Sequence, residues 1–288
     1  MRAAWLIPET IGSRISVNNQ LKVEEIVNIA HEAGGAILEI YKQKDLEVTM
    51  KDDVSPLTHA DMASHHLIID ALHRLTPVLP VLSEESGAIP YEERKKWSTY
   101  WLVDPLDGTK EFLRRNGEFT VNIALIKNGC PVLGVVHAPA IEVTYYGEAN
   151  MGAYKQVQNG KPIPIKVSDY HAPKLKIVIS RLHAVDAVGN LLKKINDYEC
   201  MSMGSSLKLC LVAEGAAHLY PRLGPTMEWD TAAAQCVVEC AGGSVTDLDG
   251  NVLRYNKADL LNPGFMVCGF PPYPWQSLIK QGAISNAQ

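Results

Sequence analysis

The stretch Trp101–Thr109, WLVDPLDGT, holds the feature from which both the fold and the chemistry are predicted. Its apolar start predicts a buried strand, which delivers Asp104 and Asp107 three residues apart. Pro105 has its φ held at about −65°, and Gly108 tolerates a conformation that a Cβ would block. A turn of this kind can gather two carboxylates and a backbone carbonyl around one point. That all-oxygen set is what Mg²⁺ prefers.

Two further acidic elements lie next to predicted regular structure. Ser83–Ser86 follows a short apolar strand, and Glu228–Ala234, EWDTAAA, precedes a helix. Taken alone, the first is typical of a solvated loop and the second of a helix N-cap at Asp230. If the fold brings these elements to the 101–109 loop, their carboxylates repel one another unless cations lie between them, and two cations there could clamp a phosphate oxygen. The four carboxylates concerned are Glu84, Asp104, Asp107 and Asp230.

Composition limits the class of protein. The 288 residues are 47% hydrophobic and 20% charged, which excludes a disordered, collagenous or coiled-coil chain. The net charge is −5 and no basic block occurs, so a nucleic-acid polymer is not expected as a partner. The six cysteines include no CxxC pair and are expected to be reduced thiols of the cytosol. Cys236 and Cys240 favour buried packing, with a zinc pair as the alternative.

The ends of the chain carry no recognisable targeting segment. The first 20 residues lack the apolar core of a secretory signal, and no run approaches the ~20 apolar residues of a membrane span. We therefore expect a cytoplasmic protein. Residues 1–20 are expected to be a flexible extension, and residues 271–288, which begin at a proline pair, a loose tail.

Between these ends the pattern predicts two subdomains. Apolar spacing of three and four predicts helices over residues 21–41 and 58–75, with Thr58 and Asp61 as a capping box of the second. Gly34-Gly35 inside the first helix indicates a close neighbour. Strands over 119–127 and 132–137 are joined at Asn128-Gly129, a hairpin pattern. Residues 21–172 are thus expected to form an α+β metal-binding subdomain and residues 173–270 a smaller α/β subdomain.

The motifs resemble a known family. Asp104–Thr109 and Trp229–Gly243 are similar to the two motifs of the inositol monophosphatase and fructose-1,6-bisphosphatase superfamily of Mg²⁺-dependent, lithium-sensitive phosphatases. Within it, the chain resembles the CysQ-type 3′(2′),5′-bisphosphate nucleotidases over residues 21–268. The stretches that carry this narrower resemblance are Lys51–Asp61, Trp101–Leu125, Gly204–Arg222 and Leu261–Phe265. The resemblance implies a fructose-1,6-bisphosphatase-like layered αβαβα sandwich of two subdomains.

The resemblance also implies catalytic roles. Glu84, Asp104 and the carbonyl of Leu106 would hold one Mg²⁺, and Asp104, Asp107 and Asp230 a second, with a weaker third ion near Glu84. Asp61 and Thr109 would orient the attacking water, and Asp61 would fix the Thr109 hydroxyl. The backbone amides of Gly108 and Thr109 suit phosphate oxygens.

Further residues are implied as substrate contacts. Lys208 and Arg222 would bind a second, uncleaved phosphate, and His183 and Ser205 the nucleoside part. The full implied set of substrate contacts is Glu84, Leu106, Asp107, Gly108, Thr109, His183, Ser205, Lys208, Arg222 and Asp230.

The function that follows is hydrolysis of adenosine 3′,5′-bisphosphate to AMP and phosphate without a covalent intermediate, with its adenylyl-sulfate relative as a second substrate and a role in sulfate assimilation. The resemblance further implies a place in the cytoplasm or peripherally on the inner face of its membrane; it leaves the oligomeric state open. Alternatives are inositol monophosphatase or NADP(H) phosphatase activity. An aspartyl-phosphate phosphatase would have its aspartates two apart, not three, and a nucleotide-sensing binding module would have a broken site.

Overall fold

A seven-stranded sheet is formed by residues 81–165 in the computed structural model, which describes residues 21–43, 56–171, 174–180 and 187–278. The strands lie in chain order; the first pair is parallel and every later pair antiparallel. Asn128 and Gly129 take φ of 52° and 74°, so the predicted hairpin turn is confirmed. The strands are β1 (Val81–Ser83), β2 (Thr99–Asp107), β3 (Thr120–Lys127), β4 (Cys130–Ala138), β5 (Val143–Glu148), β6 (Gly152–Val157) and β7 (Ile163–Ile165).

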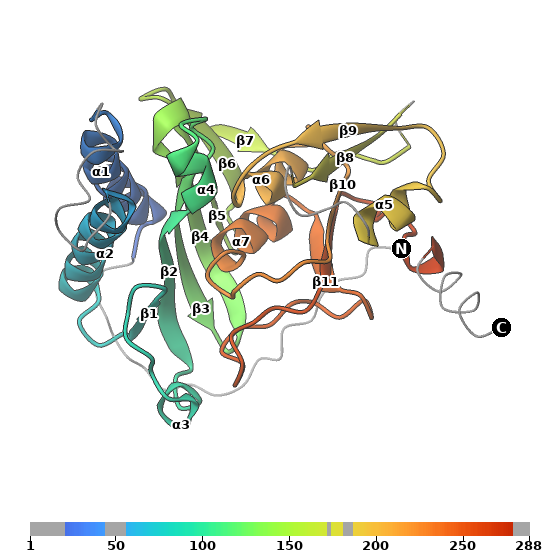
Figure 1. Ribbon diagram of the computed structural model, residues 1–288. Coiled ribbons are helices and arrows are strands. Elements are labelled where there is room, and N and C mark those ends of the chain that lie inside the picture. The colour runs from blue at the N-terminus through green and yellow to red at the C-terminus, as the bar shows by residue number, and fades with distance from the viewer. Residues whose placement is uncertain (1–20, 44–55, 172–173, 181–186, 279–288) are drawn as a thin grey trace.

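Two helices cover one face of this sheet (Figure 1), as predicted: α1 (Val23–Tyr41) and α2 (Pro56–Leu75). Their apolar stripes pack on strand residues such as Trp101 and Val121. The predicted capping box is wrong, because α2 begins at Pro56 and Thr58 therefore lies inside the first turn. Proline suits that first turn, since its fixed φ is already helical and it has no N–H to satisfy.

The glycine pair in α1 has two different surroundings. A Cβ on Gly34 would lie 2.7 Å from the side chain of His137, whereas one on Gly35 would meet nothing within 4 Å. The predicted close neighbour therefore exists at Gly34 alone.

A second, five-stranded sheet follows, in the order β11-β12-β10-β8-β9. Helices α6 and α7 lie between the two sheets, and α5 packs on the outer face of the second (Figure 1). The predicted αβαβα layering is therefore confirmed. The elements are β8 (Leu175–Ile179), α5 (Ala187–Leu192), β9 (Tyr198–Ser202), α6 (Leu207–Ala213), β10 (Leu219–Arg222), α7 (Ala232–Cys240), β11 (Ser244–Asp247) and β12 (Phe265–Cys268).

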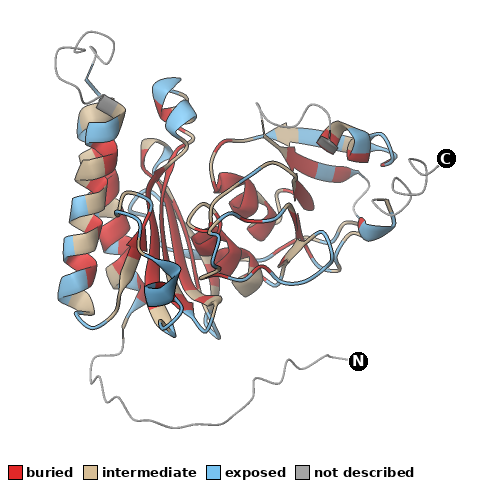
Figure 2. Cartoon of the chain, turned by 60° about the horizontal axis from the view of Figure 1, so that its bottom comes forward, coloured by how far each residue is buried: buried red, intermediate tan, exposed pale blue. Residues whose placement is uncertain are grey.

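The middle helical layer is largely buried, as are the central strands of the first sheet (Figure 2). Its helix α7 begins with three alanines, and it approaches the first sheet closely at Gly134: a Cβ there would lie 2.3 Å from the carbonyl oxygen of Ala233. Since one core cluster joins side chains of both sheets to α6 and α7, the subdomain boundaries at 172 and 270 stay predictions.

The chain beyond Gly269 differs from the expectation of a loose tail. Trp275 is 1% exposed and packs with Leu175, Ile177 and Leu219, because the outer face of the second sheet needs an apolar cover that α5 supplies only in part. Residues 1–20 and 279–288 lie outside the described residues. Within the described ranges, no helix combines the length and the apolarity that crossing a bilayer requires.

Three short helical segments complete the fold: α3 (Tyr91–Arg94), α4 (Thr109–Leu113) and the 3₁₀ turn η1 (Pro139–Ile141). The sequence pattern did not predict them, nor β6, β7, β9 and β11, because such segments are too short to show a hydrophobic period. Of these, α4 adjoins the predicted metal site, since it begins at Thr109, directly after the acidic segment Asp104–Gly108.

Candidate active site

The acidic loop lies within a strand. β2 continues to Asp107, with a register shift between Asp104 and Asp107, so a β-bulge stands where the sequence predicted a turn after the strand. The amide of Leu106 donates to Asp104 Oδ1 over 3.1 Å. The carbonyl of Pro105 accepts the Ser64 hydroxyl of α2 over 2.8 Å. Sheet pairing and the hydrogen bond from α2 therefore fix the conformation of the bulge. A turn on the surface would have neither support.

Three of the predicted ligands meet at this bulge. Glu84 follows β1, Asp104 lies in β2, and Asp230 lies just before α7; one carboxylate oxygen from each lies within 4.8 Å of the others. Asp104 is 1% exposed, whereas Glu84 is at the solvent edge. The parallel pairing of β1 with β2 explains why Glu84 lies beside Asp104, because the amide of Glu84 continues the hydrogen-bond ladder to the carbonyl of Val103.

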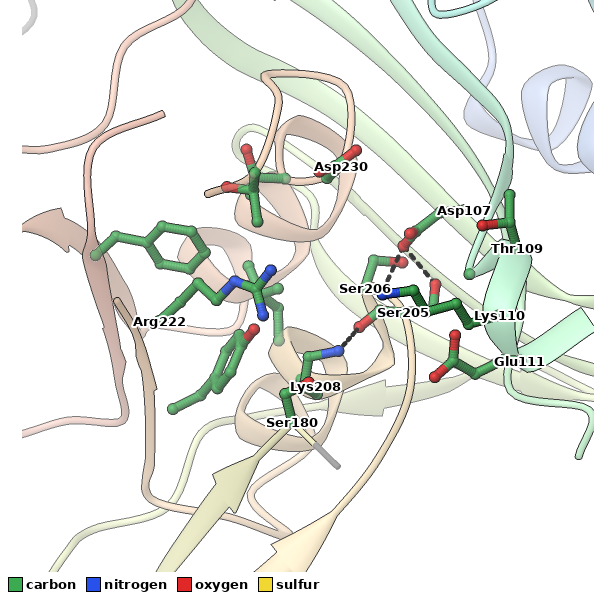
Figure 3. Close-up of a pocket in the computed structure, with 16 residues that line it drawn as sticks. Asp107, Thr109, Lys110, Glu111, Ser180, Ser205, Ser206, Lys208, Arg222 and Asp230 are labelled. Atoms are coloured by element: carbon green, nitrogen blue, oxygen red, sulfur yellow. Dashed lines mark hydrogen bonds between the residues drawn. The ribbon is translucent and has the colours of Figure 1, made fainter. Parts of the chain in front are cut away.

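Asp107 turns its carboxylate toward the start of α6 (Figure 3). Its Oδ2 accepts the Ser205 hydroxyl over 2.5 Å and the Ser206 amide over 2.7 Å. Burial raises the pKa of Glu84, Asp104 and Asp230, and the nearby charge of Asp107 raises each of them further. The structure thus brings all four predicted metal carboxylates together, with Asp107 beside the close trio.

Asp61, the predicted water-orienting acid, lies in α2 against the same cluster. It is 8% exposed, and its Oδ1 has no hydrogen-bond partner among the described residues. Burial, with added repulsion from Glu85 and Glu84, raises its pKa to about 8. Thr109 is exposed at the first position of α4. The predicted bond between its hydroxyl and Asp61 stays a prediction.

Burial is the main cause of the raised pKa values of Asp61, Glu84, Asp104 and Asp230. It raises the pKa of Asp104 well above its usual range and that of Asp230 to about 7, and neighbouring carboxylates add to both effects. Carboxylates that repel one another in a desolvated place are a donor set for hard divalent cations. The unpartnered oxygen of Asp61 fits the same interpretation, since a buried acceptor needs a donor.

A cleft opens beside the carboxylates, with an empty volume of about 740 Å³ that is partly open to solvent. Figure 3 shows Asp107, Lys110 and Glu111 on one side of the cleft and Lys208 and Arg222 across from them. Lys208 of α6 is 7% exposed and donates to the carbonyl of Ser205 over 2.5 Å; burial lowers its pKa to about 8. Arg222 ends β10 and donates to the carbonyl of Pro225. Among the described residues its buried Nε has no partner.

Four other residues were predicted to contact the substrate: Gly108, Ser205, Leu106 and His183. Gly108 precedes α4 with φ of 92°, a conformation that favours glycine, and a Cβ there would lie a tight 3.2 Å from the carbonyl oxygen of Glu118. Ser205 lines the cleft, yet its hydroxyl is engaged with Asp107. Leu106 is buried in β2. His183 lies outside the described residues.

The sequence missed how the Asp230 segment is held. Glu228 is 0% exposed and accepts the amides of Asn256 and Lys257 over 2.7 and 2.9 Å and the Lys257 ammonium over 2.6 Å. Asn262 donates to the carbonyl of Met227. The N-cap interpretation of Asp230 is wrong, because Thr231 occupies that position and the Asp230 carboxylate accepts the upstream Met227 amide.

Other polar residues of the site also escaped the sequence analysis. Thr120 and Asn122 lie opposite Asp107 and Asp104 in β3. A signal was present: both are polar, two residues apart and therefore on one face, in an otherwise apolar strand.

The zinc alternative at Cys236 and Cys240 finds no support. Their sulfurs lie 4.0 Å apart, a distance that one zinc ion could bridge, but the one group of three or more metal-type side chains in the described part of the chain is the Glu84 trio, so no further zinc ligands accompany the cysteines there.

Removing divalent metal should make stability depend on pH. From pH 7 to 8 the folded chain holds protons on Asp61 and Asp230 that the unfolded chain, with ordinary pKa values near 3.8, has lost. The free energy of unfolding in EDTA should therefore fall as pH rises, by up to about 1.4 kcal/mol per pH unit and group. Above pH 8 the lowered pKa of Lys208 acts in the opposite direction.

Urea titrations at pH 7 and 8, with EDTA or with Mg²⁺, measure this effect. Mg²⁺ should reduce the slope to the part that comes from Glu239, whose pKa is also raised to about 7 and which lies at the far end of α7. Asp61→Asn should make the slope shallower in EDTA. The same slope in both media would contradict a cation site at these carboxylates.

Comparison with known proteins covers almost the whole chain. The model of the inositol monophosphatase family matches residues 19–285. The 3′(2′),5′-bisphosphate nucleotidase CysQ of Salmonella typhimurium is 49% identical over 247 residues, 85% of this chain and 98% of that protein. The protein of the same name from Haemophilus influenzae is 37% identical over 265 residues, covering 91% and 98%. The crystal structure of CysQ from Bacteroides thetaiotaomicron superposes with a TM-score of 0.77 at 41% identity, covering 86% of this chain and 96% of that one.

Proposed function

Because the chain belongs to the inositol monophosphatase family, whose members are metal-dependent, we propose that it hydrolyses adenosine 3′,5′-bisphosphate to AMP and phosphate. One observation carries the proposal: Asp107 and Asp230 line the same cleft as Lys208 and Arg222, and Glu84 and Asp104 lie directly beside Asp230. A substrate with two phosphates suits that arrangement, with one phosphate at the carboxylates and the other at the cations. The names of the similar CysQ proteins support this substrate.

The donors present fit Mg²⁺, and we propose two ions with a weaker third near Glu84. Glu84, Asp104 and the Leu106 carbonyl would hold one, and Asp104, Asp107 and Asp230 the other. Every one of these donors is an oxygen, as a hard cation requires. Bound Mg²⁺ supplies a more acidic water and offsets negative charge on the transferring phosphoryl group. We also propose that Li⁺ inhibits the enzyme by occupying one of these Mg²⁺ positions.

The chain's own groups then orient the reactants. Asp61 is a buried acceptor with one unpartnered oxygen in the described structure, so it can hold or take a proton from the Thr109 hydroxyl or a water beside it. The amides of Gly108 and Thr109 stand at the start of α4, where backbone N–H groups suit phosphate oxygens. No side chain needs to form a covalent bond.

Phosphate release from a set of phosphate esters tests the proposal. The purified protein with Mg²⁺ is given adenosine 3′,5′-bisphosphate, its adenylyl-sulfate relative, inositol 1-phosphate, fructose 1,6-bisphosphate and NADP, and the Asp104→Asn variant, expected to be nearly inactive, serves as blank. A large preference for the adenosine bisphosphate is expected. Preference for inositol 1-phosphate or NADP would keep the metal centre and discard the nucleotide assignment. No release at all would favour a nucleotide-binding protein without catalysis.

Lys208→Met should separate the two phosphates of the substrate. We expect KM for the bisphosphate to rise by about ten- to a hundredfold, since a buried charge-assisted hydrogen bond is lost. KM for adenosine 3′-monophosphate should stay within about threefold. Methionine keeps most of the buried volume, and Lys176→Met on the exposed side of β8 is the control. Equal changes for both substrates would contradict a role in binding the second phosphate.

We propose that the protein works in the cytoplasm, where removal of adenosine 3′,5′-bisphosphate would serve sulfate assimilation. The comparisons give no support to the peripheral membrane association that the resemblance implied, and it is not part of this proposal.

A further inference from the structure

A buried polar network lies behind the bulge of β2 that carries Asp104 and Asp107. Thr120 and Asn122 of β3 are 0% and 1% exposed, and Ser206 at the start of α6 is 2% exposed. The Thr120 hydroxyl lies 2.5 Å from that of Ser205 and 2.9 Å from that of Ser206. The Ser206 hydroxyl donates to Asn122 Oδ1 over 2.8 Å. Side chains of the first sheet and of the middle helical layer thus meet in one hydrogen-bonded group.

Thr120 has one hydroxyl proton and three acceptors within reach, because its hydroxyl also lies 3.2 Å from Asn122 Oδ1; its shortest contact is the one with Ser205. Ser205 donates its single hydroxyl proton to Asp107 Oδ2, because an ionised carboxylate oxygen can only accept. The short contact between the Thr120 and Ser205 hydroxyls then requires Thr120 to be the donor. Thr120 therefore orients the Ser205 hydroxyl, and the Ser205 hydroxyl holds Asp107.

The strand register places the network there. The bulge in β2 sets Asp104 opposite Asn122 and Asp107 opposite Thr120, so a spacing of three on one strand faces a spacing of two on the other. Side chains at 120 and 122 share one face of β3. Thr120 is absent from the described lining of the cleft, so it supports the site from behind and contacts no substrate there.

We propose that Thr120 is a positioning residue for the metal centre, which acts through Ser205 to orient the Asp107 carboxylate. Both recorded hydrogen bonds of that carboxylate go to Oδ2, so Oδ1 is the oxygen offered to a cation. Groups that hydrogen-bond a metal ligand, as Ser205 does here, commonly change metal affinity by ten- to a hundredfold when removed, and Thr120, one hydrogen bond further out, is expected at the lower end of that range. This inference rests on the proposed metal site and adds a residue that the site's ligand set does not contain.

Mg²⁺ binding to the metal-free protein, measured by calorimetry without substrate, tests the inference. Thr120→Val keeps the shape and removes the hydroxyl, so Kd for Mg²⁺ should rise about tenfold. Thr120→Ser restores the hydroxyl and should return Kd to within about threefold of the unaltered protein. Thr120→Ala, which also lacks the hydroxyl, should match valine and takes its place if the valine variant does not fold.

Thr144→Val is the matched control. Thr144 is also a buried threonine of the first sheet, 2% exposed, and its hydroxyl lies 2.7 Å from His31 Nε2 and 3.0 Å from His137 Nδ1. It lies in β5, which contributes no ligand, so its loss should lower stability and leave Mg²⁺ affinity unchanged.

The outcomes separate this inference from the proposed function. Unaltered protein that binds no Mg²⁺ would overturn the metal site itself. Unaltered protein that binds Mg²⁺ while folded Thr120→Val binds it equally well would overturn the positioning role alone. Equal weakening by Thr120→Val and Thr144→Val would show a general loss of structure and would likewise overturn that role.

Discussion

Asp104→Asn should lower kcat for adenosine 3′,5′-bisphosphate by about a thousandfold or more, which corresponds to about 4 kcal/mol of transition-state stabilisation. Asp104 is the ligand that both proposed ions share, and it is 1% exposed, so no water can replace its lost oxygen charge. Asparagine keeps the shape of the side chain and can still accept the Leu106 amide.

Stability separates this effect from a damaged fold. In EDTA, Asp104→Asn should be at least as stable as the unaltered protein, because a neutral amide removes repulsion from Glu84 and Asp230. With saturating Mg²⁺ the order should reverse, since binding stabilises only the protein that binds.

Glu239→Gln is the control for this variant. Glu239 is another desolvated carboxylate, with its pKa raised to about 7, at the opposite end of α7 from Asp230. It should keep a kcat within about twofold of the unaltered protein. A folded Asp104→Asn variant with near-normal kcat would remove the metal assignment from this residue.

Gly134→Ala should destabilise the fold by about 3 kcal/mol, the upper end of what overpacking usually costs. The added Cβ would lie 2.3 Å from the Ala233 carbonyl oxygen and 2.8 Å from the Cys236 Cβ. The nearest obstacle is helix backbone, which cannot rotate away as a side chain would. Either α7 must move off the sheet or β4 must bend, and both loosen the core that the two sheets share.

Urea unfolding in EDTA measures this cost without the contribution of bound metal. Gly35→Ala is the matched control, because a Cβ there meets nothing within 4 Å and alanine favours the helix by up to about 1 kcal/mol. Gly35→Ala should be neutral or stabilising. If Gly134→Ala changes stability by less than about 0.5 kcal/mol, the close approach of α7 to β4 is not present in solution.

The loop that holds Asp104 and Asp107 illustrates how far the sequence could be interpreted. Residue types and spacing correctly indicated a buried strand leading into an acidic element, and the family resemblance indicated its partners Glu84 and Asp230. The predicted conformation of this element, a turn, was wrong, because a turn and a bulge have the same local composition. What separates them is the partner strand β3, whose pairing continues to Thr120 opposite Asp107.

The sequence alone therefore determined the long helices, the Asn128-Gly129 hairpin and the ligand chemistry of the acidic residues. Local periodicity, turn chemistry and ligand chemistry depend only on residue type. Tertiary structure decided the rest. It seated Trp275 against the second sheet, set Gly134 against α7, and brought Thr120 through Ser205 to Asp107 across 85 residues of chain. Contacts of this kind depend on which backbones lie within a few ångströms of one another, and no local pattern records that distance.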